Sequence, residues 1–378
     1  MLRRQAIAIL LLAAPVAFAG SRITSKDYYR IISVSDPRLS PDGHWVAFVA
    51  GRAEERSDRR RTTIWLVAAD GSTAPRQLTT AQNATHPRWS ADSRGVAFLS
   101  ARPLPDDPLG SGAKPQIYFL PLDGGEPRRL TNLKNGVTAF EFSPDGWKIA
   151  CVSRAGSGDE RSSRHEETDV HDYVYPFYKL DGAGWFDERR AHIWVTDLKT
   201  HQTQQITSGN ETNDLEPQWS PDGTRIAYIG QRLDGEALAG DVWAAPAGGG
   251  EPTHISVDRQ FPRSPRWSPD GARIAYIAEE NAAAVPKIWI APAAGHLRSE
   301  LAAEDVTFPN EIVWSDDGRA LYADAPTHGS YQVFRVDLAS QRAVPLTTGQ
   351  REIRHVHFTH GVPLMVYTAS DATHPGDV

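Results

Sequence analysis

The sequence predicts an all-β fold, a seven-bladed β-propeller of four-stranded antiparallel blades in which the last blade is incomplete. The first observation is a Ser-x-Asp-Gly phrase followed by an apolar stretch, which starts at Ser40, Ser143, Ser220, Ser268 and Ser315, with the variant Ser90-Ala91-Asp92-Ser93. These starts lie 50, 53, 77, 48 and 47 residues apart. A period of roughly 40 to 50 residues is typical of propeller blades.

Each unit begins with a strand that runs into this phrase, as in Pro265-Arg266-Trp267-Ser268. The phrase itself predicts a tight turn. An Asp in such a turn accepts backbone N–H groups two residues further on, and Gly adopts the positive φ that other residues resist.

A second strand follows each turn, because an aliphatic residue stands three positions after the Gly or Ser93 and is followed by Ala in five units. Such apolar runs indicate strands buried on both faces. The third strand carries a β-branched residue and an aromatic one: Ile64-Trp65, Ile117-Tyr118, Ile193-Trp194, Val242-Trp243, Ile288-Trp289 and Val333-Phe334. Most units then close with a Leu-Thr-like pair such as Leu78-Thr79, which predicts the fourth strand of a blade.

The repeats place the blades near 37–80, 87–132, 139–208, 216–257, 264–303 and 311–348, with a partial seventh at 354–378. In the seventh, residues 355–358 and 364–368 resemble two strands and 359–361 a degenerate turn. Because strands three and four are missing there, we expect a C-terminally truncated piece of a longer protein. A complete chain with an irregular last blade is the alternative.

The N-terminus predicts a signal peptide over residues 1–19. Arg3-Arg4 precede the apolar run Ala6 to Ala14, and Ala17-Phe18-Ala19 forms a cleavage site. We therefore expect a secreted or periplasmic protein. Residues 20–36 form an N-terminal segment with a short helix from Thr24 or Ser25 through Arg30, and 37–378 form the propeller.

Composition narrows the function classes. A formal net charge of −7 without a basic stripe argues against nucleic-acid binding. No stretch after the signal peptide is long and apolar enough to span a membrane. The single cysteine, Cys151, has no internal disulfide partner and is expected in the core.

The third unit contains an insertion, residues 154–191, that is rich in charges and aromatics. Long loops in compact folds are usually functional or disordered. Within it, Glu166-Glu167 would attract a substrate amino group, although a surface charge pair is the commoner explanation. The nearby His and Asp residues lack zinc or calcium spacing, so we predict no metal site.

Motifs for catalysis are missing from the sequence. It contains no G-x-S-x-G, no P-loop, no G-x-G-x-x-G and no H-E-x-x-H. We therefore predict neither a catalytic residue nor a cofactor in this chain.

Three segments resemble the propeller of the prolyl oligopeptidase family of serine peptidases, in its dipeptidyl aminopeptidase and acylaminoacyl peptidase branch. They are the opening Ile23-Thr24-Ser25-Lys26-Asp27-Tyr28-Tyr29-Arg30 running on to Gly43, the stretch from Tyr178 to Trp194, and Ser370-Asp371-Ala372-Thr373-His374-Pro375-Gly376-Asp377. The resemblance covers about residues 22 to 378.

The resemblance implies a substrate-gating propeller of a secreted serine exopeptidase or oligopeptidase that acts on short peptides. In that family an α/β-hydrolase domain carries the catalytic triad. That domain is absent from this chain, so we expect it to be non-catalytic by itself. By analogy, substrate contacts are expected at Glu166, Glu167, Arg189 and Arg190. Two alternatives remain: a TolB-like periplasmic propeller that binds a protein partner, and a propeller enzyme that acts on sugars in its own channel.

Overall fold

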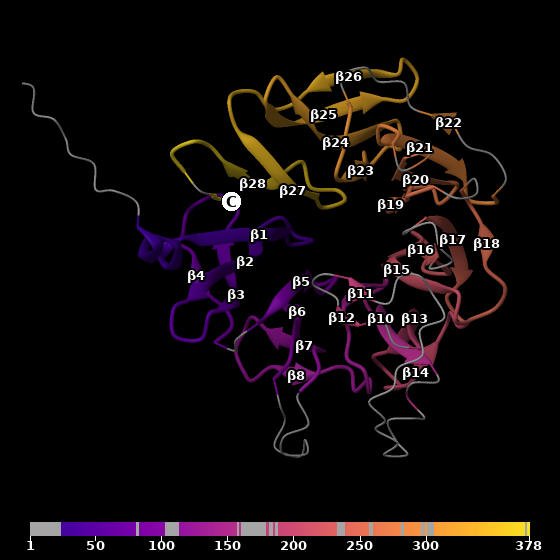
Figure 1. Cartoon of the computed structure of the whole chain (residues 1–378), viewed down its shortest axis with the longest axis horizontal. Coiled ribbons are helices and arrows are strands. Elements are labelled where there is room, and N and C mark those ends of the chain that lie inside the picture. The colour runs from indigo at the N-terminus through magenta and orange to yellow at the C-terminus, as the bar shows by residue number, and fades with distance from the viewer. Residues whose placement is uncertain are drawn as a thin grey trace, which may run out of the picture.

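The computed structural model describes residues 24–80, 83–102, 113–156, 159, 179–180, 184–185, 188–232, 239–256, 260–279, 281, 283–295, 299–300, 306–374 and 376–378. These residues form an all-β propeller of six blades around a ring; five blades are four-stranded sheets, and the sixth belongs to a six-stranded sheet (Figure 1). The four strands of each blade are antiparallel to their neighbours and consecutive along the chain, apart from a hairpin inserted in the third blade.

The first blade consists of β1 (Ile32–Leu39), β2 (Trp45–Glu54), β3 (Arg59–Ala68) and β4 (Arg76–Gln77). The second consists of β5 (Thr85–Trp89), β6 (Gly95–Ser100), β7 (Gln116–Pro121) and β8 (Arg128–Arg129). The third consists of β9 (Ala139–Phe142), β10 (Lys148–Gly156), β13 (Arg189–Asp197) and β14 (Thr203–Gln205), and between β10 and β13 lies the hairpin β11 (Lys179–Leu180) and β12 (Gly184–Trp185).

The fourth blade consists of β15 (Thr212–Trp219), β16 (Arg225–Arg232), β17 (Gly240–Pro246) and β18 (Thr253–His254). The fifth consists of β19 (Arg263–Trp267), β20 (Arg273–Ala278), β21 (Lys287–Pro292) and β22 (Ser299–Glu300). The sixth consists of β23 (Ile312–Trp314), β24 (Ala320–Thr327), β25 (Ser330–Asp337) and β26 (Arg342–Pro345), and its sheet also includes β27 (Glu352–Phe358) and β28 (Met365–Ser370).

The prediction of seven blades with an incomplete last one is wrong, because the structure has six. Residues 354–378 contain most of β27 and all of β28, and this hairpin joins the sixth sheet through the parallel pairing of Tyr331 in β25 with Glu352 in β27. The physical reason is visible in the turn signal. Residues 359–361 lack both the Ser and the Asp that build the other turns, so the signature occurs only six times.

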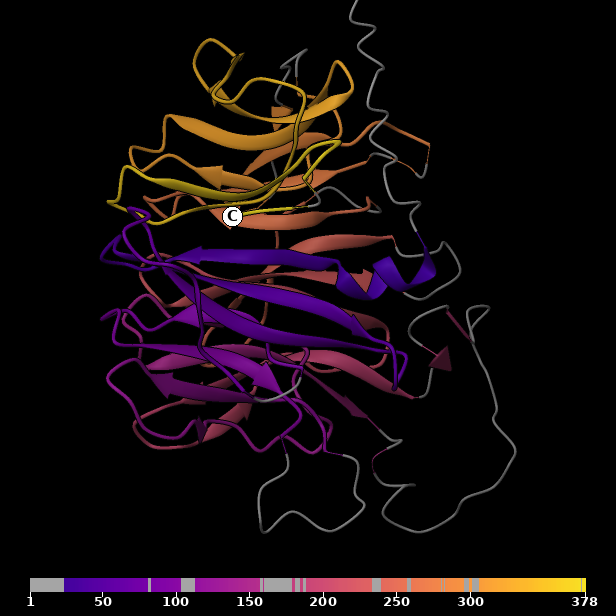
Figure 2. The same cartoon turned by 90° about the vertical axis from the view of Figure 1, so that its left-hand side faces the viewer.

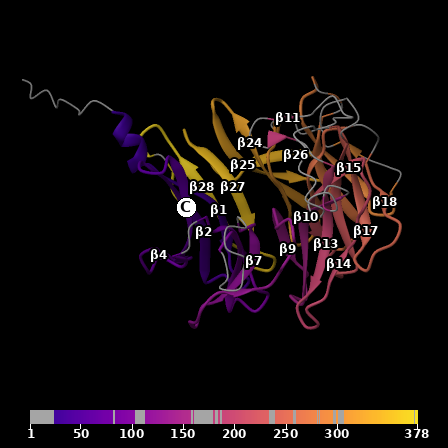
Figure 3. The same cartoon turned by 60° about the horizontal axis from the view of Figure 1, so that its bottom comes forward.

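The β27–β28 hairpin fills the space between the sixth blade and the first (Figures 1 and 3). On the side of the first blade, Leu39 N–H donates to His357 Nδ1 at 3.3 Å, and Thr359 Oγ1 donates to the Leu39 carbonyl at 3.0 Å. On the side of the sixth blade, Asp316 contacts His360 Nδ1 at 2.5 Å and accepts from Gly361 N–H at 2.9 Å. The hairpin therefore closes the ring by side-chain hydrogen bonds.

The predicted turns form as expected from their residues. In the fifth blade, Ser268 Oγ donates to Asp270 Oδ1 at 2.5 Å and accepts from Arg273 N–H at 2.9 Å, while Asp270 Oδ1 accepts from Ala272 N–H at 3.0 Å. Gly271 has a φ of 70°. The same Ser-to-Asp bond occurs in all six turns.

The second strands are the core, as their apolar runs predict. Their paired residues are at most 4% exposed: Val46-Ala47, Val96-Ala97, Ile149-Ala150, Ile226-Ala227 and Ile274-Ala275. Cys151 is fully buried in β10, and burial raises the pKa of its thiol to about 12. This environment favours the protonated thiol and makes Cys151 a core residue.

Two recurrent hydrogen bonds explain the Trp and the Leu-Thr signals. The Trp at the end of an inner strand donates from its ring nitrogen to a carbonyl of the preceding blade's inner strand, as Trp267 does to Gln218 at 3.1 Å and Trp314 to Arg266 at 3.0 Å. The hydroxyl oxygen of the Thr in the closing pair accepts a hydrogen bond from a backbone N–H of the third strand, as Thr79 Oγ1 does from Ile64 N–H at 3.0 Å. The first bond links blades, and the second completes a blade's outer edge.

A short 3-10 helix, η1 (Ser25–Arg30), precedes β1, with Thr24 as its N-cap residue. Thr24 N–H donates to Asp27 Oδ2 at 2.8 Å.

The turns between first and second strands lie on one face of the ring, which we call the turn face. Figure 2 shows η1 and the β11–β12 hairpin on the opposite face, which we call the insertion face.

Candidate functional site in the axial cavity

A cavity of about 340 Å³ lies on the axis of the propeller. Inner-strand residues from all six blades and from β27 line it, and the polar ones among them are Arg38, His86, Arg88, Glu141, Glu216, Gln218, Arg266, Glu311 and His357. A pocket of this size and polarity suits a small ligand. It is the strongest candidate site in the described part of the chain.

Repeated β-bulges aim the side chains into this cavity. In β1, β5, β15, β19 and β27 the register against the next strand shifts by one residue, for example between Arg263 and Arg266. The first residue of each bulge has positive φ: Asp36 at 49°, His86 at 54°, Glu216 at 52°, Ser264 at 53° and His355 at 53°. A bulge bends its strand and redirects a side chain, and bulges are common beside active sites.

Proline occupies the second position of four of these bulges: Pro37, Pro87, Pro217 and Pro265. Proline lacks the N–H that a sheet ladder needs, so bulges are among the few places where a strand accepts it. The non-glycine residue before it adopts a conformation that costs on the order of 1 to 3 kcal/mol. Such strain, repeated around one cavity, supports a functional role for the side chains that it positions.

The inner strands place most of these charges in two layers along the axis. The position four residues before the turn Ser supplies Asp36, Glu216 and Glu311, which we call the carboxylate layer, although the strand of Glu311 has no bulge. Two residues later, Arg38, Arg88 and Arg266 form the guanidinium layer, and Glu141 occupies the same position in the third blade. Each inner strand runs toward its turn, so the carboxylate layer lies nearer the insertion face and the guanidinium layer nearer the turn face.

In blades one to three the charges are paired. Arg88 donates to Glu141 Oε1 at 2.7 Å and to Asp36 Oδ2 at 3.2 Å, and Arg38 Nε donates to Asp36 Oδ1 at 2.7 Å. Burial alone would raise the pKa of Asp36, but the charges of Arg38 and Arg88 outweigh it and hold that pKa well below its usual range. This side of the cavity is a closed ion-pair network.

In blades four to six the charges remain apart. Within the described residues, no carboxylate oxygen lies within 4.0 Å of the Arg266 guanidinium, whose one hydrogen bond goes to the Pro265 carbonyl at 2.9 Å. Burial lowers the pKa of Arg266, although the Glu216 and Glu311 carboxylates oppose that shift. Burial also raises the pKa of Glu311. The charged side chains of blades one to three therefore form close ion pairs, whereas Arg266, Glu216 and Glu311 in blades four to six do not.

His357 lies where the cavity meets the closing hairpin. Because its Nδ1 accepts from Leu39 N–H, the ring is neutral in this arrangement. Burial, reinforced by Arg38 and Arg88, holds the pKa of His357 well below its usual range. The histidine therefore serves as a hydrogen-bond acceptor at the seam.

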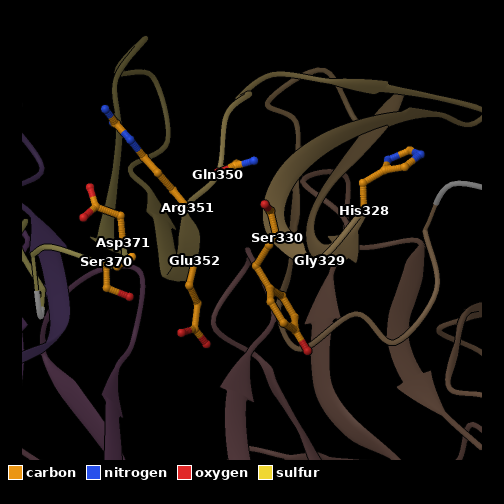
Figure 4. Close-up of a pocket in the computed structure, with 10 residues that line it drawn as sticks. His328, Gly329, Ser330, Gln350, Arg351, Glu352, Ser370 and Asp371 are labelled. Carbon is orange, nitrogen blue, oxygen red and sulfur yellow. The ribbon is translucent and has the colours of Figure 1, made fainter.

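A second cleft, of about 550 Å³, lies on the insertion face between β25 and the β27–β28 hairpin (Figure 4). Glu352 and Tyr331 line it together with Arg351 and Asp371. Glu352 pairs with Arg354 at 2.9 Å, and the Arg354 guanidinium lies 3.5 Å from the Tyr331 ring centroid. These contacts make the cleft a part of the hairpin's attachment to the sixth blade.

The residues predicted to contact substrate fall at the insertion. Glu166 and Glu167 lie outside the described residues. Arg189 and Arg190 begin β13, where Arg189 Nη1 donates to Asn135 Oδ1 at 3.0 Å and Arg190 Nε donates to the Asn210 carbonyl at 3.0 Å. Arg190 is 4% exposed. Both arginines thus fasten the base of the insertion to neighbouring loops.

Over the described ranges, no group of three or more His, Cys, Asp or Glu side chains is arranged to hold a metal ion. Among the same residues, no helix has the length and apolarity required to cross a membrane.

Two of the curated proteins that this sequence resembles are peptidases. Over 210 residues the chain is 30% identical to an uncharacterized peptidase, YuxL, of Bacillus subtilis, covering 54% of this chain and 31% of the relative. Over 361 residues it is 23% identical to dipeptidyl-peptidase 5 of Porphyromonas gingivalis, covering 88% of this chain and 50% of the relative. This propeller is related to peptidase propellers. No protein-family model matches the sequence.

Among solved structures, the propeller resembles the Pyrococcus horikoshii acylaminoacyl peptidase with a TM-score of 0.69 at 17% identity, covering 93% of this chain and 51% of that one. At this identity the likeness establishes the fold. The chain thus spans about a third to a half of the length of these three peptidases.

Sequence reasoning missed the axial cavity, although its signal was present. The Pro-Arg-Trp-Ser pattern predicts a strand, but it does not by itself indicate that the residue before the proline and the arginine after it face a common axis. The signal is a polar or charged residue on each side of a proline, at 36–38, 86–88, 216–218 and 264–266.

Proposed function

We propose that this chain is the substrate-gating propeller of a secreted serine exopeptidase or oligopeptidase that acts on short peptides. The observation that carries the proposal is the relation to dipeptidyl-peptidase 5 across 361 residues, which covers half of that protein. The resemblance to the prolyl oligopeptidase family implies that the partner is an α/β-hydrolase domain, which would supply the nucleophile, base and acid.

The narrow, charged axis supports a gating role. A cavity of about 340 Å³ enclosed by side chains from every blade admits small ligands and excludes folded protein. The ring is closed by the hydrogen bonds of one hairpin, so loosening that seam would widen access.

The insertion in the third blade is proposed to contact substrate. Glu166 and Glu167 would attract a peptide amino group, and Arg189 and Arg190 would hold the base of the insertion in place. Residues 1–19 are proposed to direct secretion or export to the periplasm.

Expression of the complete reading frame that contains this chain tests the activity. We expect labelling by a fluorophosphonate probe and cleavage of dipeptidyl and N-acetyl-aminoacyl 4-nitroanilides, with no cleavage by residues 20–378 alone. A complete protein that neither reacts with the probe nor cleaves these substrates would overturn the peptidase assignment. Recovery of a stable protein partner from periplasm would then favour the binding-protein alternative.

Gating is tested separately at the seam. The Asp316→Ala change removes the carboxylate that contacts His360 and Gly361 of the hairpin, and Asp123→Ala, on an exposed residue of the second blade, is its control. We expect Asp316→Ala to raise cleavage of an unstructured 30-residue peptide relative to a dipeptidyl 4-nitroanilide. An unchanged ratio would argue against access through this seam.

A further inference from the structure

The axial cavity contains a set of charges that no close ion pair between described residues joins. On the side of blades one to three, Arg38 and Arg88 are paired with Asp36 and Glu141 at 2.5 to 3.2 Å. On the side of blades four to six, Arg266, Glu216 and Glu311 form no ion pair within 4.0 Å with any described residue. The two sides differ in ion pairing, although inner strands on both sides contain β-bulges.

The groups on this second side have few partners of any kind. The Glu216 carboxylate accepts from Ser264 N–H at 2.8 Å, and Arg266 donates to the Pro265 carbonyl at 2.9 Å. Among the described residues, the Glu311 side chain has no hydrogen-bond partner. Glu216 is exposed, whereas Arg266 and Glu311 are partly buried. Partial removal of a charge from water without a close partner is costly, so a ligand that pairs Arg266 and Glu311 would gain affinity.

The arrangement specifies the chemistry of such a ligand. One guanidinium calls for a carboxylate, which it binds through two parallel N–H donors. Two carboxylates on the flanking blades call for a cation, and an ammonium group with three donors suits them. A simple anion would leave both glutamates unpaired, and a simple cation would leave Arg266 unpaired. A ligand with both charges pairs all three residues.

The axial offset of the two layers limits the size of the ligand. Strand residues two apart are separated by roughly 6 to 7 Å, and less where a bulge shortens the strand. A fully extended dipeptide spans about 7 Å. The cavity volume of about 340 Å³ is at the lower end for small-molecule sites.

We propose that Arg266, Glu216 and Glu311 form a binding site for a small zwitterion with a free ammonium and a free carboxylate group, such as a free dipeptide. The carboxylate binds at Arg266 on the turn-face side, and the ammonium binds between Glu216 and Glu311 on the insertion-face side. The site belongs to the propeller alone and does not depend on the proposed peptidase function.

Calorimetric titration of the 378-residue chain with Ala-Ala, N-acetyl-Ala-Ala and Ala-Ala-amide tests the site. We expect Ala-Ala to bind, and each blocked derivative to bind at least about tenfold more weakly, since each loses a charge-assisted interaction. Equal affinity for all three compounds, or no binding of Ala-Ala at millimolar concentration, would overturn the proposal.

Variants assign the two ends of the ligand. In Arg266→Gln, Ala-Ala and Ala-Ala-amide should bind equally, because the carboxylate partner is gone. In Glu311→Gln, the penalty for N-acetylation should shrink while the penalty for amidation persists. Arg335→Gln, on an exposed arginine beside Asp337, is the control and should bind like the parent chain.

These comparisons hold even if a variant is less stable, because each is a ratio of ligands on one protein. Loss of both penalties in the control would identify a nonspecific effect and refute the assignment. Peptidase activity is not measured, so failure of this site leaves the function of a complete peptidase untouched. Absence of peptidase activity would likewise leave this site intact.

Discussion

At the scale of single residues, the buried charges of the cavity combine two roles. Asp36, Arg38, Arg88 and Glu141 link the inner strands of the first three blades, whereas Arg266 and Glu311 remain available. The residue types could be read from the sequence, because arginine and acid recur two or four residues before the turn serine. Their ion pairing could not be read from the sequence, because it depends on which blades face each other across the axis and on how far each side chain extends.

The Arg88→Ala change tests the paired half of the cavity. Arg88 is 13% exposed and holds two carboxylates, so its removal should leave Asp36 and Glu141 facing each other without their shared cation. We expect a loss of about 3 kcal/mol in the free energy of unfolding, measured by denaturant titration.

Arg335→Ala is the matched comparison, because the Arg335–Asp337 pair has side chains 38% and 36% exposed. Arg335→Ala should lower the free energy of unfolding by no more than about 1 kcal/mol. Similar losses at the two arginines would show that the cavity network contributes no more than a surface ion pair.

At the scale of elements, local chemistry determined what could be predicted. The six turns, the buried second strands and the third-strand aromatics followed from residue types that act within a few positions of one another. The inner-strand bulges were not predicted, although the prolines inside these strands are a sign of them. A proline does not by itself show that the residue before it, such as Asp36 or Glu216, adopts a positive φ.

The turn glycines allow a graded test. Gly271 has a φ of 70°, and a Cβ there would meet only Pro221 Cδ at 3.8 Å, so Gly271→Ala should cost about 1 to 2 kcal/mol for backbone conformation alone. At Gly43, with a φ of 74°, a Cβ would lie 2.8 Å from Val362 Cγ1 in the closing hairpin.

Gly43→Ala should therefore destabilise the protein by about 1 kcal/mol more than Gly271→Ala, because a contact is overpacked in addition. Thermal unfolding of both variants measures the difference, and adding Val362→Ala should remove it. Equal costs at the two positions would mean that the hairpin does not press against the first turn.

At the scale of the whole molecule, the number of blades was the main error of the sequence prediction. Strand signals at 355–358 and 364–368 were real, but whether two strands count as a blade depends on which sheet edge they pair with. The pairing of Tyr331 with Glu352 is a contact between edges, and no local pattern encodes it.

The repeated turns also predict how the protein responds to acid. The pKa values of Asp42, Asp92, Asp145, Asp222, Asp270 and Asp317 are all lowered. In five of them the largest cause is the hydrogen bond from the turn serine. A carboxylate with a lowered folded pKa stabilises the protein above its unfolded pKa of about 3.9 and loses that contribution as pH falls through the folded value.

The free energy of unfolding should decline gently from pH 7 to about 5, because the unfolded state protonates histidines such as His357 whose folded pKa is lowered. The turn aspartates should add a further decline from about pH 5 toward pH 3. Urea titrations of the parent chain and of a variant with Asp222→Asn, Asp270→Asn and Asp317→Asn measure this, and the variant should show the shallower decline. Parallel curves would exclude the turn aspartates as the source of the acid sensitivity.

The supply of one sector of the cavity wall by each inner strand has a consequence for how such proteins diversify. A duplication or exchange of a single blade carries that sector, with the charge it bears, into a new ring. Ligand preference can therefore change by recombination of roughly 50-residue modules, without coordinated mutations at distant positions.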